Sequence, residues 1–116
     1  MSNRGWIGFD LDGTLAKYDT WQGITHIGKP IPAMIKKVKE HLKEGYEVKI
    51  FTARVTPYRI DDMQTCEASL AIKAWCKKHI GVELDVTCIK DFQCLCIYDD
   101  RCIRVEFNTG RILSNE

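Results

Sequence analysis

Apolar residues along the chain fall into two kinds of pattern, and each kind predicts a different element. Short apolar runs predict strands at 6–10, 46–51, 85–89, 94–98 and 102–107. Between these runs, apolar residues three and four positions apart indicate one helix that begins near Pro32 and ends before Gly45, and a second helix over roughly 61–79. Strands and helices therefore alternate through most of the chain.

This alternation predicts an α/β fold with a mostly parallel sheet. A strand that returns to the same sheet through a helix makes a right-handed crossover, which aligns neighbouring strands in one direction. We therefore expect a Rossmann-like three-layer sandwich, in which a mostly parallel five-stranded sheet carries helices on both faces. The run at 94–98 is apolar throughout, which is typical of a strand buried on both faces. Trp6, Trp75 and Phe107 are expected in the core.

Length and composition limit the domain count, the compartment and the partners. At 116 residues the chain is expected to form one domain, residues 1–116, and its net charge of +1 gives no reason to expect a nucleic-acid or membrane partner. The first residues lack the apolar segment of a secretory signal, and no apolar run has transmembrane length. We expect a cytoplasmic protein with reduced cysteines, in which Cys88, Cys94 and Cys96 are buried as small apolar residues.

Polar or charged side chains follow four of the predicted strands, at the point where each strand ends. In chain order they are Asp10 and Asp12, then Thr52, then Lys90, then the pair Asp99 and Asp100. The carboxyl ends of parallel strands meet at one edge of a sheet, where ligands bind. Clustered carboxylates raise one another's pKa unless a cation lies among them, and carboxylate oxygens suit Mg²⁺. The sequence therefore predicts a magnesium site at this edge.

A set of this kind has the groups needed for phosphoryl transfer. A carboxylate can attack phosphorus to give an aspartyl-phosphate, which water then hydrolyses. A second carboxylate can protonate the leaving oxygen and later deprotonate the water. A hydroxyl and an ammonium group can hold the phosphoryl oxygens and balance their charge.

The same residues resemble the four motifs of the haloacid-dehalogenase-like (HAD) hydrolase superfamily, in the family order. The first motif corresponds to residues 10–15 (Asp-Leu-Asp-Gly-Thr-Leu) and the second to residues 50–54 (Ile-Phe-Thr-Ala-Arg). Lys90 stands in the place of the third, and residues 98–100 (Tyr-Asp-Asp) in that of the fourth. The motifs extend over most of the chain, so the resemblance implies a phosphatase fold and Mg²⁺ as cofactor.

The resemblance also implies a role for each acidic residue. Asp10 would be the nucleophile and a magnesium ligand, and Asp12 would be the general acid and base, with its main-chain carbonyl on the metal. Asp99 would bind Mg²⁺ directly, and Asp100 directly or through water. An aspartate at the position of Asp12 is the pattern of the phosphatases in this superfamily, and it argues against dehalogenase chemistry.

Other residues of the motifs would hold the substrate. The resemblance implies that Thr52 and Lys90 bind the transferring phosphoryl group and take part in catalysis. Ala53 and Arg54 would line the substrate site beside Thr52. Each of the first two gaps between motifs is filled by one loop and one helix, so the chain resembles members without a cap domain, with residues 16–30 as a small flap.

An open site of this kind admits several phosphorylated substrates, either small molecules such as nucleotides or larger ones such as a nucleic-acid end. Tyr18, Trp21 and His26 in the flap have two interpretations: they stack on or contact the substrate, or they pack within the flap. No membrane partner is expected.

Three alternatives to a hydrolase remain open. A receiver domain, which is phosphorylated rather than catalytic, has an acidic site, a threonine and a lysine on a similar sheet, but in a different order. A HAD-like fold can also serve as a catalytically inactive interaction module. A phosphotransferase would use the same site with another acceptor, and the sequence does not distinguish it from a hydrolase.

Overall fold

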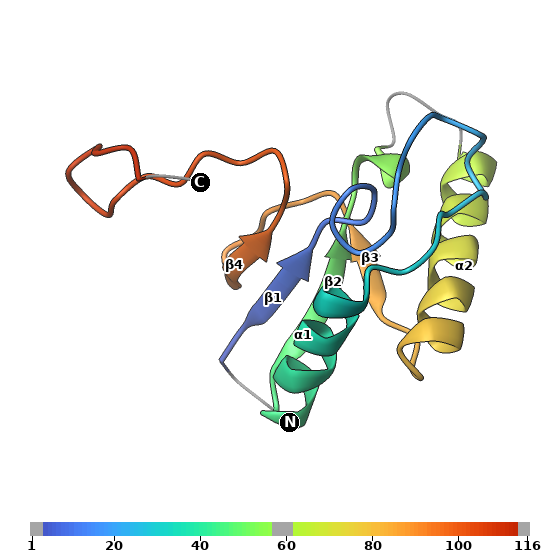
Figure 1. Cartoon of the computed structure of the whole chain (residues 1–116), viewed down its shortest axis with the longest axis horizontal. Coiled ribbons are helices and arrows are strands. Elements are labelled where there is room, and N and C mark those ends of the chain that lie inside the picture. Colours follow the sequence, from blue (N-terminus) through green and yellow to red (C-terminus); the bar gives the residue numbers. More distant parts are fainter. Residues whose placement is uncertain (1–3, 57–61, 114–116) are drawn as a thin grey trace.

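Four parallel strands and two α-helices form the frame of the residues that the structure describes, 4–56 and 62–113 (Figure 1). The structure is a computed structural model. In chain order the elements are β1 (Trp6–Phe9), α1 (Pro32–Lys43), β2 (Glu47–Phe51), the 3₁₀ helix η1 (Ala53–Val55), α2 (Asp62–His79), β3 (Asp85–Thr87) and β4 (Cys94–Tyr98). The predicted α/β fold with a parallel sheet is thus confirmed. Residue 61, the expected start of the second helix, lies outside the described residues.

Helix α1 has the bounds that its sequence predicts. Pro32 occupies the first turn, where a missing backbone N–H leaves no hydrogen bond unmade, and Ile35 and Val38 form its buried stripe. Gly45 follows the helix with a φ of 93°, a conformation that L-residues with a side chain rarely adopt. Within the described ranges, neither α-helix combines the length and apolar character that crossing a bilayer requires.

Strand β1 lies inside the sheet, where the strand order is β3-β2-β1-β4. It pairs in parallel with β2 on one side and with β4 on the other, and all four of its residues are buried. In this register Phe9, at the end of β1, lies beside Ile50 and Tyr98. The carboxyl ends of β1, β2 and β4 therefore reach the same edge of the sheet.

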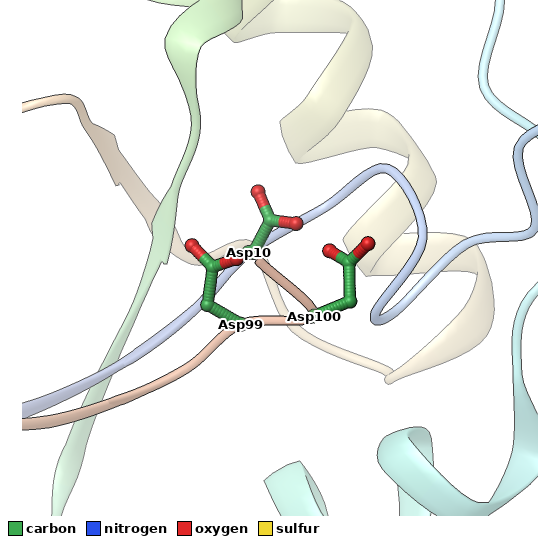
Figure 2. Close-up of side chains that lie close together, drawn as sticks. All are labelled: Asp10, Asp99 and Asp100. Atoms are coloured by element: carbon green, nitrogen blue, oxygen red, sulfur yellow. The ribbon is translucent and has the colours of Figure 1, made fainter. Parts of the chain in front are cut away.

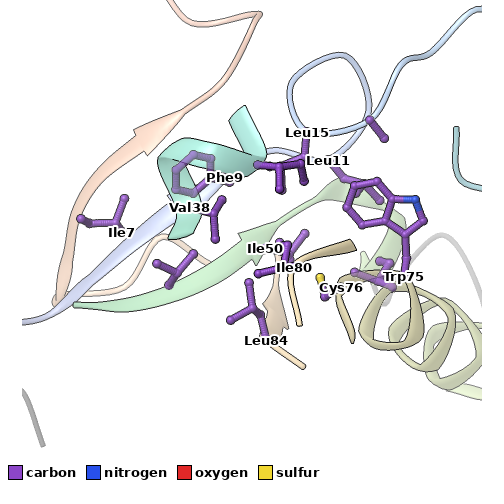
Figure 3. Packing of buried hydrophobic residues seen from close by; sticks show 14 residues of the cluster. Ile7, Phe9, Leu11, Leu15, Val38, Ile50, Trp75, Cys76, Ile80 and Leu84 are labelled. Atoms are coloured by element: carbon purple, nitrogen blue, oxygen red, sulfur yellow. The ribbon is translucent and has the colours of Figure 1, made fainter. Parts of the chain in front are cut away.

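The core lies between both helices and one face of the sheet (Figure 3). Successive side chains of a strand point to opposite faces, so Ile7 and Phe9 share one face of β1. Buried residues of both helices join them in one cluster: Ile35 and Val38 from α1, and Ile72, Trp75 and Cys76 from α2. Because β1, β2 and β3 are laid down in one direction across the sheet, right-handed crossovers place α1 and α2 on the same side.

The opposite face carries no helix among the described residues, so the expected helices on both faces are not found. Trp6 belongs to this face, and a Cβ placed on its neighbour Gly8 would lie 2.8 Å from the Trp6 ring. Residues 88–93, which connect β3 to β4, cross here, and Asp91 Oδ1 accepts a hydrogen bond of 2.8 Å from Trp6 Nε1. This irregular segment covers Trp6, which is only 1% exposed.

The expected fifth strand is also not found within the described residues. Residues 102–107 join no sheet, and Val105 forms an isolated bridge to Ile112. Figure 1 shows this segment extending away from the sheet, and Phe107, which was expected in the core, is 85% exposed. A segment with the apolar pattern of a strand forms one only where a neighbouring strand offers free backbone N–H and C=O groups. Here the chain turns away from β4 before residues 102–107 can pair with it.

Without a fifth strand beside it, β4 lies at an edge of the sheet. It is therefore not buried on both faces, and Cys96 is exposed while Cys94 is half-buried. Cys88, after β3, is also half-buried. The prediction that these three cysteines are buried apolar residues is wrong, because it depended on neighbours that the sheet does not have.

Candidate active site

Asp10, Asp99 and Asp100 come together at the carboxyl ends of β1 and β4. One carboxylate oxygen from each residue lies within 4.8 Å of the others, and Figure 2 shows the three side chains pointing to the same side. Asp10 follows Phe9 and Asp99 follows Tyr98, which are paired in register, and the Asp10 N–H donates to the Tyr98 carbonyl at 2.8 Å. Adjacent strands that end at the same level thus unite residues far apart in sequence.

The three acids suit a divalent cation. Oxygen ligands on opposite sides of an Mg²⁺ ion are about 4.2 Å apart, since each lies roughly 2.1 Å from the metal. A set of oxygens within 4.8 Å of one another matches this span after a small side-chain adjustment. Carboxylate oxygens are also hard, anionic ligands, and they suit Mg²⁺ better than they suit softer metals. The residues present therefore fit the predicted cofactor.

The charge balance of the site favours a cation as well. Burial, a hydrogen bond with Asp100 and the negative charges of Asp99 and Asp100 together raise the pKa of Asp10 from 3.8 to about 7. The backbone N–H of Leu11 opposes this rise. Near neutral pH, Asp10 therefore carries a proton part of the time, and a cation among the acids would displace it.

Gly13 and Thr14, which follow Asp12 in the chain, shape this acidic group. Gly13 has a φ of 89°, and a Cβ there would lie 2.9 Å from Asp100 Oδ2, so a side chain would fill the space beside the acids. The Thr14 hydroxyl lies 3.3 Å from Asp10 Oδ2 and 3.2 Å from Asp100 Oδ1, and it accepts a hydrogen bond from the Asp100 N–H at 3.1 Å.

The hydroxyl of Thr14 has one proton, so it can donate to only one of these carboxylates at a time. Sequence reasoning gave Thr14 no role. Its position inside the first motif, between acids that must be held together, was the signal that could have found it.

Asp12 does not join the three acids with its side chain. Its carboxylate forms a two-pronged ion pair with Arg54, at 2.8 Å from Nε to Oδ2 and 2.9 Å from Nη2 to Oδ1. Nη1 of Arg54 donates to the carbonyl of Ile24 at 2.9 Å and to that of Gly23 at 3.4 Å. Arg54, predicted to contact substrate, therefore links Asp12 to the flap, because its nearly buried guanidinium requires an anion and carbonyls.

Thr52 lies at the end of β2, as its position in the sequence predicts. It is 4% exposed, and its hydroxyl oxygen accepts a hydrogen bond from the Arg54 N–H at 3.2 Å, which caps η1. This cap fixes the direction in which Ala53 and Arg54 leave the strand. Thr52, Ala53 and Arg54 line one cavity together with Asp10 and Asp12.

The structure does not bring Lys90 to the acids. Lys90 is exposed and does not line the cavity, and among the described residues no ion pair joins it to a carboxylate. Desolvation and the charges of Asp99 and Asp10 raise the pKa of the Cys102 thiol, and Lys90 opposes this rise. Lys90 therefore lies within electrostatic range of the acidic edge without contacting it.

The cavity over the acids has a volume of about 690 Å³, much more than a phosphate group needs. Besides the residues of the motifs, it is lined by Tyr18, Trp21 and Ile24 from the flap and by Arg101 after β4. His26, the other flap residue considered from the sequence, lies in a neighbouring cavity of about 470 Å³. The flap thus forms one wall of the space in front of the acids.

Comparison with known proteins extends the description of the fold only. The chain matches no protein-family model and no curated protein. It is similar to the solved structure of a conserved protein from Bacteroides thetaiotaomicron, with a TM-score of 0.57 and 19% sequence identity. The alignment covers 86% of this chain and 78% of that one. At this identity the likeness indicates a shared fold and says nothing about the reaction.

Proposed function

We propose that this chain is a Mg²⁺-dependent phosphomonoester hydrolase of the HAD type, without a cap domain, that reacts through an aspartyl-phosphate. The observation that carries the proposal is the meeting of Asp10, Asp99 and Asp100, with carboxylate oxygens within 4.8 Å of one another. Two of these acids, Asp10 and Asp100, line a cavity that also includes Thr52 and the Asp12–Arg54 pair. Its substrate is a phosphorylated small molecule or a nucleic-acid end.

The proposed reaction uses these side chains in two steps. When bound, Mg²⁺ would neutralise the phosphate charge and orient its oxygens. An oxygen of the Asp10 carboxylate attacks phosphorus and forms a P–O bond, while the P–O bond to the alcohol breaks and the alcohol takes a proton from Asp12. Asp12 then removes a proton from water, which attacks phosphorus, releases inorganic phosphate and restores Asp10. The Thr52 hydroxyl holds a phosphoryl oxygen.

The ion pair between Asp12 and Arg54 sets the order of events. In this arrangement both oxygens of the Asp12 carboxylate are engaged by the guanidinium, so Asp12 is not available to pass a proton to a leaving group or to take one from water. A phosphate dianion that enters the cavity competes with Asp12 for the guanidinium of Arg54. This exchange would free Asp12 to take a proton from solvent water, which Asp12 then gives to the departing alcohol, and it would return Arg54 to the substrate contact that the sequence predicts.

Phosphate release in the presence of Mg²⁺ tests the proposal. A panel of nucleotides, sugar phosphates and phosphopeptides would be assayed with the wild type, with Asp10→Asn and with the control Asp85→Asn on the exposed start of β3. We expect Asp85→Asn to match the wild type, and Asp10→Asn to lose turnover by several orders of magnitude. Equal turnover by Asp10→Asn and the wild type would exclude Asp10 as the nucleophile.

One observation favours a second candidate, a phosphoacceptor or interaction module without turnover. Lys90 stands apart from the cavity, so the positive charge that would support hydrolysis is not in place. Labelling of Asp10 by acetyl phosphate, without steady release of phosphate from any ester, would support this candidate over the hydrolase.

A further inference from the structure

Two aromatic side chains of the flap face the cavity above the acids. Tyr18 is 47% exposed and Trp21 is 53% exposed, and both line the cavity that contains Asp10 and Asp12. The other two tryptophans, Trp6 and Trp75, are 1% and 8% exposed. The chain therefore buries indole rings where it has a core, and leaves this one open beside the candidate active site.

Trp21 is held in place by the residue that also binds Asp12. The guanidinium carbon of Arg54 lies 4.9 Å from the centre of the Trp21 ring, within the range of a cation–π contact. Arg54 in turn binds the Asp12 carboxylate and the carbonyls of Gly23 and Ile24, two and three residues beyond Trp21. An exposed ring that is anchored in this way is already arranged for binding, so a ligand loses little affinity in ordering it.

We propose that Trp21 and Tyr18 form a stacking platform for the base of a nucleotide whose phosphate lies against Asp10 and Thr52. This inference rests on the proposed function, and it assigns that function a substrate class. Base–aromatic stacking is tolerant of the base, because every base has a flat π-face. The platform therefore predicts a preference for nucleotides as a class over phosphate esters without a ring.

The dimensions of the site favour a nucleotide over a phosphorylated tyrosine. The cavity volume of about 690 Å³ lies in the ordinary range for small-molecule sites and leaves room for a base and a sugar beyond the phosphate. The guanidinium of Arg54 binds the Asp12 carboxylate and also contacts the Trp21 ring. Because the Arg54 side chain occupies space next to Trp21, we infer that a ring on Trp21 needs a spacer between itself and its phosphate, which a ribose supplies and a phenyl phosphate does not.

Steady-state kinetics with two kinds of substrate test the platform. The ribonucleoside 5′-monophosphates would be compared with glycerol phosphate, for the wild type, Trp21→Leu and the conservative control Trp21→Phe. We expect Trp21→Leu to raise KM for the nucleotides about tenfold or more, the size of a lost stacking contact, and to leave glycerol phosphate within about twofold. Trp21→Phe keeps a flat ring and should retain most of the nucleotide preference.

Tyr18→Leu gives an independent variant in case Trp21→Leu does not fold, and the same shift toward equal use of both substrates is expected. Equal effects of Trp21→Leu on nucleotides and glycerol phosphate would overturn the platform and leave the hydrolase intact. A lower KM for phosphotyrosine than for any nucleotide would overturn the assignment to nucleotides.

Binding without turnover separates this inference from the proposed function. Trp21 is the exposed tryptophan, so adenosine, which has no phosphate, should quench the fluorescence of wild-type protein and of Asp10→Asn, but not that of Trp21→Phe. Quenching in a protein that hydrolyses no ester would support the platform while the proposed function fails. Hydrolysis of nucleotides without any quenching by adenosine or by adenosine 5′-monophosphate would refute the platform alone.

Discussion

Replacing Asp10 with asparagine should stabilise the metal-free protein at pH 8, even though it removes the proposed nucleophile. In the folded chain, burial and the neighbouring acids raise the pKa of Asp10 from 3.8 to about 7. Below about pH 4 the carboxyl group is protonated in both folded and unfolded chains. Between these two values unfolding releases the proton, so stability falls as the pH rises from about 4 to about 7 and is level above that. Asparagine is neutral throughout and avoids this loss.

The size of the effect follows from the same difference in pKa. At 1.36 kcal/mol per pKa unit, a change from 3.8 to about 7 corresponds to roughly 4 kcal/mol. Asp10 is only half-buried, and solvent screens its interaction with the exposed Asp100. We therefore expect Asp10→Asn to be more stable than the wild type by about 1–2 kcal/mol at pH 8, and by much less at pH 5.

Urea denaturation with a chelator present, at pH 5 and pH 8, measures this difference. The exposed Asp85 serves as the control, since Asp85→Asn should leave the free energy of unfolding unchanged at both pH values. Added Mg²⁺ should reverse the order at pH 8, because the wild type gains a ligand-bound state that Asp10→Asn binds weakly. A wild type that is as stable as Asp10→Asn at pH 8, without metal, would refute the reasoning about charge in this site.

Three further substitutions test the residues around the acids. Thr14→Val removes the acceptor of the Asp100 N–H and should lower the free energy of unfolding by about 1–3 kcal/mol in urea denaturation, whereas Thr14→Ser should lower it much less. Gly13→Ala places a Cβ 2.9 Å from Asp100 Oδ2 and should weaken Mg²⁺ binding in calorimetry at unchanged helix content; undiminished affinity would contradict the geometry. Arg54→Lys keeps the charge but cannot make both hydrogen bonds to Asp12, so kcat for phosphate release should fall at least about tenfold; an unchanged kcat would show that the pair is not used.

The sequence predicted the parts of the site that depend on strand ends. Asp10 and Asp99 are separated by most of the chain, yet each follows an apolar run of a parallel sheet, and this alone brings them to one edge. The position of Thr52 follows from the same rule. Helix α1 was predictable because a proline and a glycine mark its ends.

Other features depend on contacts that a one-dimensional pattern does not contain. Residues 102–107 have the apolar alternation of a strand, but pairing requires a free edge in reach, and the chain turns away from β4. Arg54 binds the Asp12 carboxylate and two carbonyl groups of the flap in place of a substrate. Which of these partners it binds depends on how the flap folds back over it. The reach of Lys90 depends on where the chain goes after β3, and no local preference fixes that path.

The segment between β3 and β4 limits how the acids can be arranged, although it contributes no carboxylate to them. Strands β3 and β4 are three strand spacings apart across the sheet, or about 14 Å. By the strand pairing, the end of β3 is level with Asp10, just after the end of β1, whereas β4 begins beside Trp6. The chain must therefore also run back along the strand direction by four residues, or about 13 Å, before β4 can begin in parallel. The straight path is about 19 Å, while the seven peptide steps from Thr87 to Cys94 reach at most about 25 Å. A chain shortened by two residues could not span this distance, and β4 would have to slide, which would carry Asp99 away from Asp10.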